Sequence, residues 1–112
     1  MPDDAERFPA DALCVEAGYG GTEVTLIVEG ELDLSGTELF WAYASEALGS
    51  HPRSIVVDAR GLTFVDSAGL MALSRARDAA DAAGVAFGVS NATRAVRRVV
   101  ELLGLEDLLS DE

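Results

Sequence analysis

Apolar residues follow two spacings along the chain, and together these predict a mixture of strands and helices. Apolar runs of strand length, alternating or continuous, occur at 13–17, 22–30, 54–59 and 85–90. Apolar positions recur every three or four residues, as in helices with one buried face, over 37–48, 67–83 and 91–104. The predicted order is therefore strand, strand, helix, strand, helix, strand, helix.

This order predicts the fold class. Strand–helix–strand units require parallel neighbouring strands joined by right-handed crossovers. The glycine-rich turn at 18–21 joins the first two runs as a hairpin. We therefore expect an α/β (α+β-like) fold with a four- to five-stranded mixed sheet and helices packed mainly on one face. The continuous apolar run 54–59 is expected to be a central strand buried on both faces.

The ends of the chain and of its helices have recognisable signals. Residues 1–11 are expected to form a flexible acidic tail, which leaves 12–112 as one domain of ordinary size. Ser35 is expected to cap the first helix, because its hydroxyl can accept a hydrogen bond from a free backbone N–H group. Asn91 or Thr93 is expected near the start of the last helix.

Charge and cysteine content restrict the partners. The formal net charge is −12, which disfavours nucleic acid and anionic membranes, because both select basic surfaces. The single cysteine, Cys14, excludes an intramolecular disulfide and a multi-thiolate metal site. The N-terminus lacks the apolar core of a signal peptide, and no apolar stretch reaches membrane-spanning length. We therefore expect a soluble, cytoplasmic protein without membrane insertion.

The segment 64–76, FVDSAGLMALSRA, places a serine at the start of the second predicted helix. Small and apolar residues collect on one side of that helix: Gly69, Ala72, Leu73, Ala76, Ala79, Ala80 and Ala83. Ser67 lies on the opposite side, with Leu70, Met71 and Ser74 as its helical neighbours. A leucine and a methionine beside a hydroxyl predict a contact patch for another protein. The alternative is that a loop or the third helix covers them.

Three roles are open to Ser67. It can cap the helix, with Asp66 as the alternative cap. It can accept a phosphate, which the free N–H groups and dipole of a helix N-terminus stabilise. A nucleophilic role lacks a base, since the only histidine, His51, lies in a proline-containing loop and there is no lysine. We therefore expect no catalytic residue and no enzyme activity.

Three aspartates, Asp33, Asp58 and Asp66, each follow an apolar run, so all three are expected near one edge of the sheet. One interpretation is a magnesium or phosphoryl-transfer site. The other is a set of solvated carboxylates at strand ends. We favour the second because the chain has no lysine to complete such a site, and we expect neither a metal nor a cofactor.

Three segments carry a family resemblance. SIVVDARGLTFVDSAGLMAL (54–73) resembles the central motif of STAS domains, most closely that of single-domain anti-sigma factor antagonists. GELDLSG (30–36) is similar to the family's Gly-Glu-Leu-Asp segment, and ATRAVRRVVELLGLEDLL (92–109) resembles its last helix and C-terminal segment. The likeness covers about residues 13–109. The chain departs from the family at Ala68, where a second serine is frequent, and in a more basic segment at 59–61.

The resemblance implies a partner-switching function. In that family the unphosphorylated antagonist binds an anti-sigma factor, a serine kinase of the histidine-kinase-like ATPase fold, and so releases a sigma factor. The kinase then phosphorylates the serine after the motif aspartate, and a metal-dependent serine phosphatase restores the antagonist. Ser67 matches the phospho-acceptor, Asp66 the motif aspartate and Asp33 the aspartate near the acceptor. Nucleotide and magnesium belong to the kinase.

The expected partner-binding set combines the resemblance with the helical pattern: Asp33, Asp66, Ser67, Leu70, Met71 and Ser74. STAS domains also serve as adaptors in stressosomes and lipid-transport complexes. A lipid-transport or stressosome adaptor without sigma-factor control is therefore the alternative function.

Overall fold

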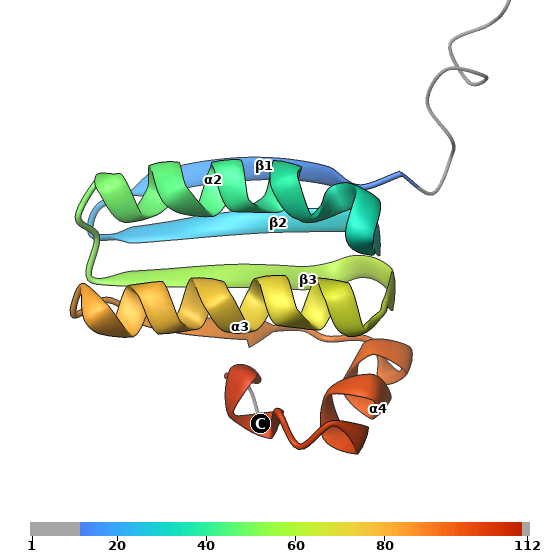
Figure 1. The fold of residues 1–112 in the computed structure, drawn as a ribbon. Helices are drawn as coiled ribbons and strands as arrows, with labels where there is room; N and C mark the ends of the chain where they lie inside the picture. The colour runs from blue at the N-terminus through green and yellow to red at the C-terminus, as the bar shows by residue number, and fades with distance from the viewer. Residues whose placement is uncertain (1–11, 111–112) are drawn as a thin grey trace, which may run out of the picture.

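The computed structural model describes residues 12–110, and helices cover one face of a four-stranded sheet within them (Figure 1). The strands lie in the order β1 (Cys14–Gly20), β2 (Glu23–Leu32), β3 (Ser54–Val65) and β4 (Ala86–Ser90). The strand β1 pairs antiparallel with β2, whereas β2, β3 and β4 are parallel. This is the α/β fold with a mixed sheet that the order of elements predicted. The expected acidic tail at 1–11 lies outside the described residues.

Three helices connect and flank the strands: α2 (Thr37–Gly49), α3 (Ser67–Ala82) and α4 (Arg94–Leu102). Short 3-10 turns, η1 (Leu34–Gly36) and η2 (Glu106–Leu108), precede α2 and follow α4. Figure 1 shows α2 and α3 side by side over the same face of the sheet, with α4 beside the start of α3. None of these helices is long and apolar enough to cross a membrane.

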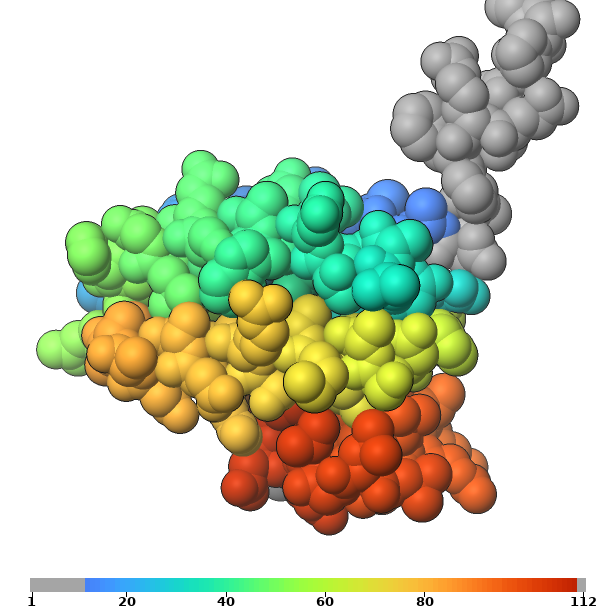
Figure 2. Space-filling model, viewed as in Figure 1, coloured from blue at the N-terminus to red at the C-terminus, as the bar shows by residue number. Residues whose placement is uncertain are grey.

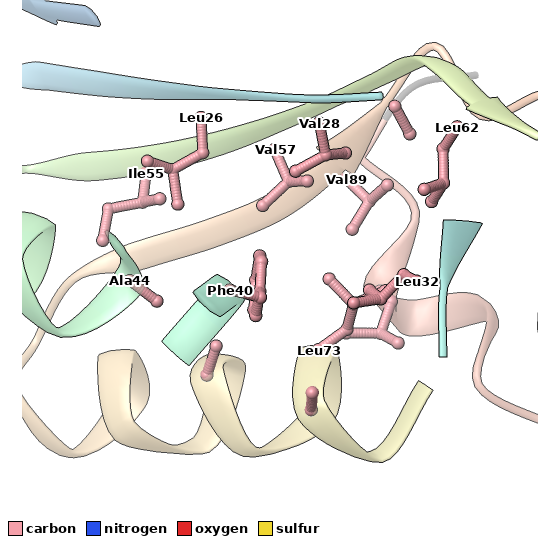
Figure 3. Close-up of a cluster of buried hydrophobic side chains, with 14 of the residues drawn as sticks. Leu26, Val28, Leu32, Phe40, Ala44, Ile55, Val57, Leu62, Leu73 and Val89 are labelled. Carbon is pink, nitrogen blue, oxygen red and sulfur yellow. The ribbon is translucent and has the colours of Figure 1, made fainter. Parts of the chain in front are cut away.

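The core fills the space between the sheet and the two covering helices, as Figure 3 shows. Leu26 and Val57 extend from the sheet toward Phe40 of α2 and Leu73 of α3, and all four side chains are buried. Burial alternates along the strands, so β3 is buried on one face and only half-buried at Val56 on the other. The expectation that this strand is buried on both faces is wrong, because the covering helices lie on one face only.

The starts of the first and last helices test two of the predictions made from side-chain chemistry, and one of them is correct. Thr93 caps α4, since its hydroxyl accepts a hydrogen bond from the Val96 N–H group at 3.3 Å. The prediction for Ser35 is wrong, because it lies inside the 3-10 turn η1 and donates its own hydrogen bonds to Asp33. Gly36 precedes α2 without a side-chain cap.

The C-terminal segment returns to the sheet. The backbone N–H of Ser110 donates to the carbonyl of Val89 at 2.9 Å, and Leu109 forms an isolated parallel bridge with the same residue. Gly88 leaves room for this segment, because a Cβ atom there would collide with the Ser110 side chain. This pairing holds the end of the chain against β4 and extends the sheet by a single bridge.

Candidate functional site

The junction between β3 and α3 is closed by an aspartate cap. The Asp66 carboxylate accepts a hydrogen bond from the backbone N–H of Gly69 at 2.9 Å, and the Asp66 carbonyl accepts one from Leu70 at 2.9 Å. The first bond satisfies one of the N–H groups that lack a partner within the helix, and the second is the first backbone bond of the helix itself. Ser67 is therefore not the cap, and the alternative cap considered from the sequence, Asp66, is the correct one.

Ser67 is the first residue of α3, and its side chain is exposed. Within residues 12–110 its hydroxyl forms no hydrogen bond, since Asp66 already caps the helix. The hydroxyl therefore faces solvent at the end of the helix where backbone N–H groups point outward. This is a suitable position for a group that another protein modifies.

Gly69 allows α3 to start directly against the end of β2. A Cβ atom at Gly69 would collide with the Leu32 carbonyl oxygen and lie 2.8 Å from a methyl carbon of Val65. The backbone N–H of Asp66 also lies 3.4 Å from the Leu32 oxygen, in hydrogen-bond geometry. The glycine in DSAGL is thus a packing requirement that determines where the serine lies.

Asp33 lies beside this junction because the two parallel strands end together. Leu32 pairs with Val65, so the residues that follow them, Asp33 and Asp66, leave the sheet side by side. The Asp33 carboxylate accepts hydrogen bonds from the backbone N–H of Ser35 at 3.0 Å and from its hydroxyl at 2.7 Å. Both carboxylates are half-buried, and each fixes the turn that follows its strand.

Asp58 does not belong to this cluster. The prediction that all three aspartates share one edge is wrong, because β3 continues to Val65 instead of ending at residue 59. Asp58 lies within the strand and accepts hydrogen bonds of 3.1 Å from the Arg60 backbone and from the Asn91 amide. Residues 12–110 contain no group of three or more potential ligand side chains placed to hold a metal ion.

Leu70 and Met71 lie in opposite environments, although both were expected on the exposed side of α3. Leu70 is only 1% exposed and belongs to the buried cluster that includes Val96 and Val100 of α4, whereas Met71 is 61% exposed. Leu70 lies three residues from both Ser67 and the buried Leu73, so it is at the border of the buried face of α3. Because its side chain is buried, the side of α3 toward α4 is closed to a partner. The assignment of Leu70 to the docking surface is therefore wrong.

The exposed patch around Ser67 contains a residue that sequence reasoning missed. A hollow of about 280 Å³ opens beside Met71, and Leu34, which is 74% exposed, lines it together with Ala68. Ser74 is half-buried one turn further along α3. The signal in the sequence that could have identified Leu34 is its position directly after the Gly-Glu-Leu-Asp segment. We use "Ser67 patch" for Leu34, Ser67, Ala68 and Met71.

Comparison with known proteins agrees with this architecture. A family model described as "Mlab, STAS domain" matches residues 17–110. A STAS-domain-containing protein of Pseudomonas aeruginosa is 31% identical over 88 residues, which cover 79% of this chain and 86% of that protein.

Two solved structures have the same fold. The anti-sigma factor antagonist SpoIIAA in its unphosphorylated form has a TM-score of 0.76 and 23% identity, covering 88% of each chain. An anti-sigma factor antagonist from Mycobacterium paratuberculosis has a TM-score of 0.76 and 21% identity, covering 89% of this chain and 85% of the other. The family match and the fold agree with the resemblance seen in the sequence: the chain belongs to the STAS-domain family.

Proposed function

We propose that the chain is an anti-sigma factor antagonist whose Ser67 is the phosphorylated switch. In this function the unphosphorylated chain binds a kinase-type anti-sigma factor and releases a sigma factor. The observation that carries the proposal is the free Ser67 hydroxyl, exposed at the start of α3 beside Met71. The resemblance of the DSAGL motif to that of anti-sigma factor antagonists supports it.

A phosphate on Ser67 would change the charge of the Ser67 patch without requiring the domain to refold. A phosphoserine carries a charge of about −1.5 to −2 at neutral pH. The free N–H groups at the start of α3 favour an anion there, so the helix retains its start. The added charge would stand beside Asp33 and Asp66 and next to the apolar Met71 side chain. A partner surface that fits the unmodified patch would then meet repulsion and buried charge.

The direct test is phosphorylation of the full chain by the kinase-type anti-sigma factors of its own genome. Each kinase is incubated with the chain and ATP, and intact and fragment mass spectrometry locates the added phosphate. We expect one phosphate on Ser67 and none on Ser67→Ala. Ser45→Ala is the matched control, because Ser45 is an exposed serine on α2 outside the Ser67 patch, and this variant should still be phosphorylated on Ser67. Absence of phosphate on Ser67 with every such kinase would overturn the proposal.

An adaptor subunit without sigma-factor control is the second candidate. The observation that favours it is the family match, whose model is described as "Mlab, STAS domain", since STAS domains also serve in lipid-transport complexes. In an adaptor the Ser67 patch would bind its partner constitutively. Native mass spectrometry of the chain purified from its own cells separates the two functions: a phosphorylated fraction supports the switch, and a stable complex with transport subunits supports the adaptor.

A further inference from the structure

We propose that a groove between α2 and α3 binds an amphipathic helical segment of the partner, with a carboxylate on the segment paired to Arg75. This inference rests on the proposed function, since it describes the partner that binds beside Ser67. It adds a second contact region, at Trp41 and Arg75, to the Ser67 patch. Figure 2 shows the face concerned, on which side chains of α2 and α3 lie along each other.

The groove consists of two adjoining hollows with shared walls. The first, of about 230 Å³, is lined by Thr37, Glu38, Trp41, Ala42, Ala72 and Arg75. The second is the hollow of about 280 Å³ beside Met71 and Leu34, and it shares Thr37, Ala72 and Arg75 with the first. The lining residues recur on each helix at the three- and four-residue spacing of one helical face. They span residues 37–42 of α2 and 68–75 of α3. The longer stretch is about 11 Å, which matches two turns of a docked helix.

Arg75 and Trp41 give the groove its chemical character. The Arg75 guanidinium lies 5.3 Å from the centre of the Trp41 ring, in a cation–π contact. Within residues 12–110 no carboxylate pairs with Arg75. What distinguishes Arg75 among the exposed arginines of residues 12–110 is its contact with the Trp41 ring. Stacking on the ring leaves the edge of the guanidinium free to donate hydrogen bonds to a carboxylate.

These features define the bound segment. Ala42 and Ala72 are small, so the groove floor admits apolar side chains of the partner between the two helices. Arg75 requires a carboxylate, whereas Glu38 at the same hollow disfavours a second one nearby. The segment is therefore a helix with apolar side chains along one face and a single aspartate or glutamate among them. Toward the Ser67 patch it meets Leu34 and Met71, which favour further apolar contacts.

Phosphorylation acts on only one end of this groove. Ser67 and Arg75 are eight residues apart on α3, or about 12 Å along the helix axis. That distance exceeds the Debye length of about 8 Å at physiological ionic strength, so a phosphate on Ser67 barely weakens a contact at Arg75. The contacts at Trp41 and Arg75 therefore contribute a part of the binding affinity that phosphorylation of Ser67 leaves nearly unchanged.

The test uses peptides, so that it does not depend on the identity of the partner. A phage library of helix-favouring peptides of about twelve residues, roughly three turns, is selected on the full chain. Trp41 is the only tryptophan, so its fluorescence reports binding at the groove directly. We expect selected peptides that carry one carboxylate between apolar residues and that shift the Trp41 emission.

Charge reversal supplies the decisive variants. Arg75→Glu is expected to weaken these peptides about tenfold, because an attraction becomes a repulsion. Replacing the peptide carboxylate by lysine should restore binding to Arg75→Glu. Arg98→Glu, on the exposed surface of α4, is the matched control and should have no effect. Ser67→Asp should weaken peptide binding by less than about threefold, given the screening.

A steric variant tests the groove without altering charge. Ala42 is exposed and lines the hollow at Trp41, so Ala42→Gln should block it, while Ser45→Gln, exposed on the same helix outside the groove, should not. Selected peptides without a carboxylate, or binding unchanged in both Arg75→Glu and Ala42→Gln, would overturn the inference. If the peptides behave as expected but no kinase-type anti-sigma factor binds the chain, the proposed function is wrong, whereas binding of a helical segment in the groove remains supported.

Discussion

The two flanks of α3 are built from the same helix but have opposite surfaces. On the side toward α4, Leu70 is buried with Val96 and Val100 in the core. On the side toward α2, Met71 is exposed, and a groove remains open along Ala72 and Arg75. Adjacent residues of one helix thus serve different purposes: Leu70 stabilises the domain, and Met71 is available to a partner.

The difference narrows where the proposed partner surface can lie. From helical spacing alone, both flanks of the serine were equivalent, and either could face a partner. Because α4 and η2 lie beside one flank, the proposed docking at Ser67 is directed toward the other, where Leu34 is also exposed. Substitutions that disturb the packing of the whole of α3, and then substitutions on each flank separately, test whether the two flanks differ in this way.

The largest effect is expected where α3 meets the sheet. Gly69→Ala should destabilise the domain by more than about 3 kcal/mol, because the new Cβ collides with the Leu32 carbonyl and overpacks the junction. Urea unfolding followed by circular dichroism measures the loss. Gly49→Ala is the control and should be nearly neutral, since a Cβ at Gly49 meets open space. Equal stability of the two variants would refute the tight approach of α3 to β2.

Truncation on either flank should separate stability from binding. Leu70→Ala should reduce the free energy of unfolding by about 3 kcal/mol, the usual cost of truncating a buried leucine. Met71→Ala should change it by less than about 0.5 kcal/mol, because that side chain is exposed. The same unfolding experiment compares them. A Met71→Ala variant as unstable as Leu70→Ala would mean that the α2 flank is also closed.

A smaller effect is expected at the helix cap. Asp66→Ala should cost about 1 kcal/mol, since it removes the acceptor of the Gly69 N–H bond. Ser67→Ala should cost less than about 0.5 kcal/mol, because its hydroxyl makes no bond within residues 12–110. Thermal unfolding by calorimetry ranks the two. If Ser67→Ala were the more damaging, the serine would be a structural cap and the switch would lose its support.

At the groove, only a small change in stability is expected. Arg75→Gln should reduce the free energy of unfolding by about 0.5 kcal/mol, the usual value of an exposed cation–π contact. The emission spectrum of Trp41 should nevertheless shift, since the charge above its ring is removed. A loss of stability above about 1.5 kcal/mol would identify Arg75 as a structural residue and would argue against a role in binding a partner.

Local patterns in the sequence were sufficient for most of the architecture. Alternation and helical spacing located the strands and helices, and the DSAGL motif indicated the family. The errors arose where tertiary contacts decide between local options. The strand β3 continues past residue 59 because its later half pairs with the end of β2, and no local pattern contains that pairing.

The site was predicted less completely than the fold. Leu70 lies at the border of the helical stripe, so its burial depends on which elements pack beside that flank, and helical spacing does not specify them. Asp66 and Ser67 are both good caps, and only the geometry of the first turn chooses between them. The groove at Trp41 requires two helices to lie side by side, so no single segment of the sequence reveals it.

Binding to the kinase-type anti-sigma factor, before and after phosphorylation, tests the central claim most directly. Isothermal titration calorimetry compares the unmodified chain with the chain carrying phosphate on Ser67, at the same salt concentration. We predict tight binding before modification and a loss of at least about tenfold afterward, equivalent to roughly 1.4 kcal/mol. Equal affinities of the two forms would contradict the account, because the charge placed on the Ser67 patch would then have no effect on the partner.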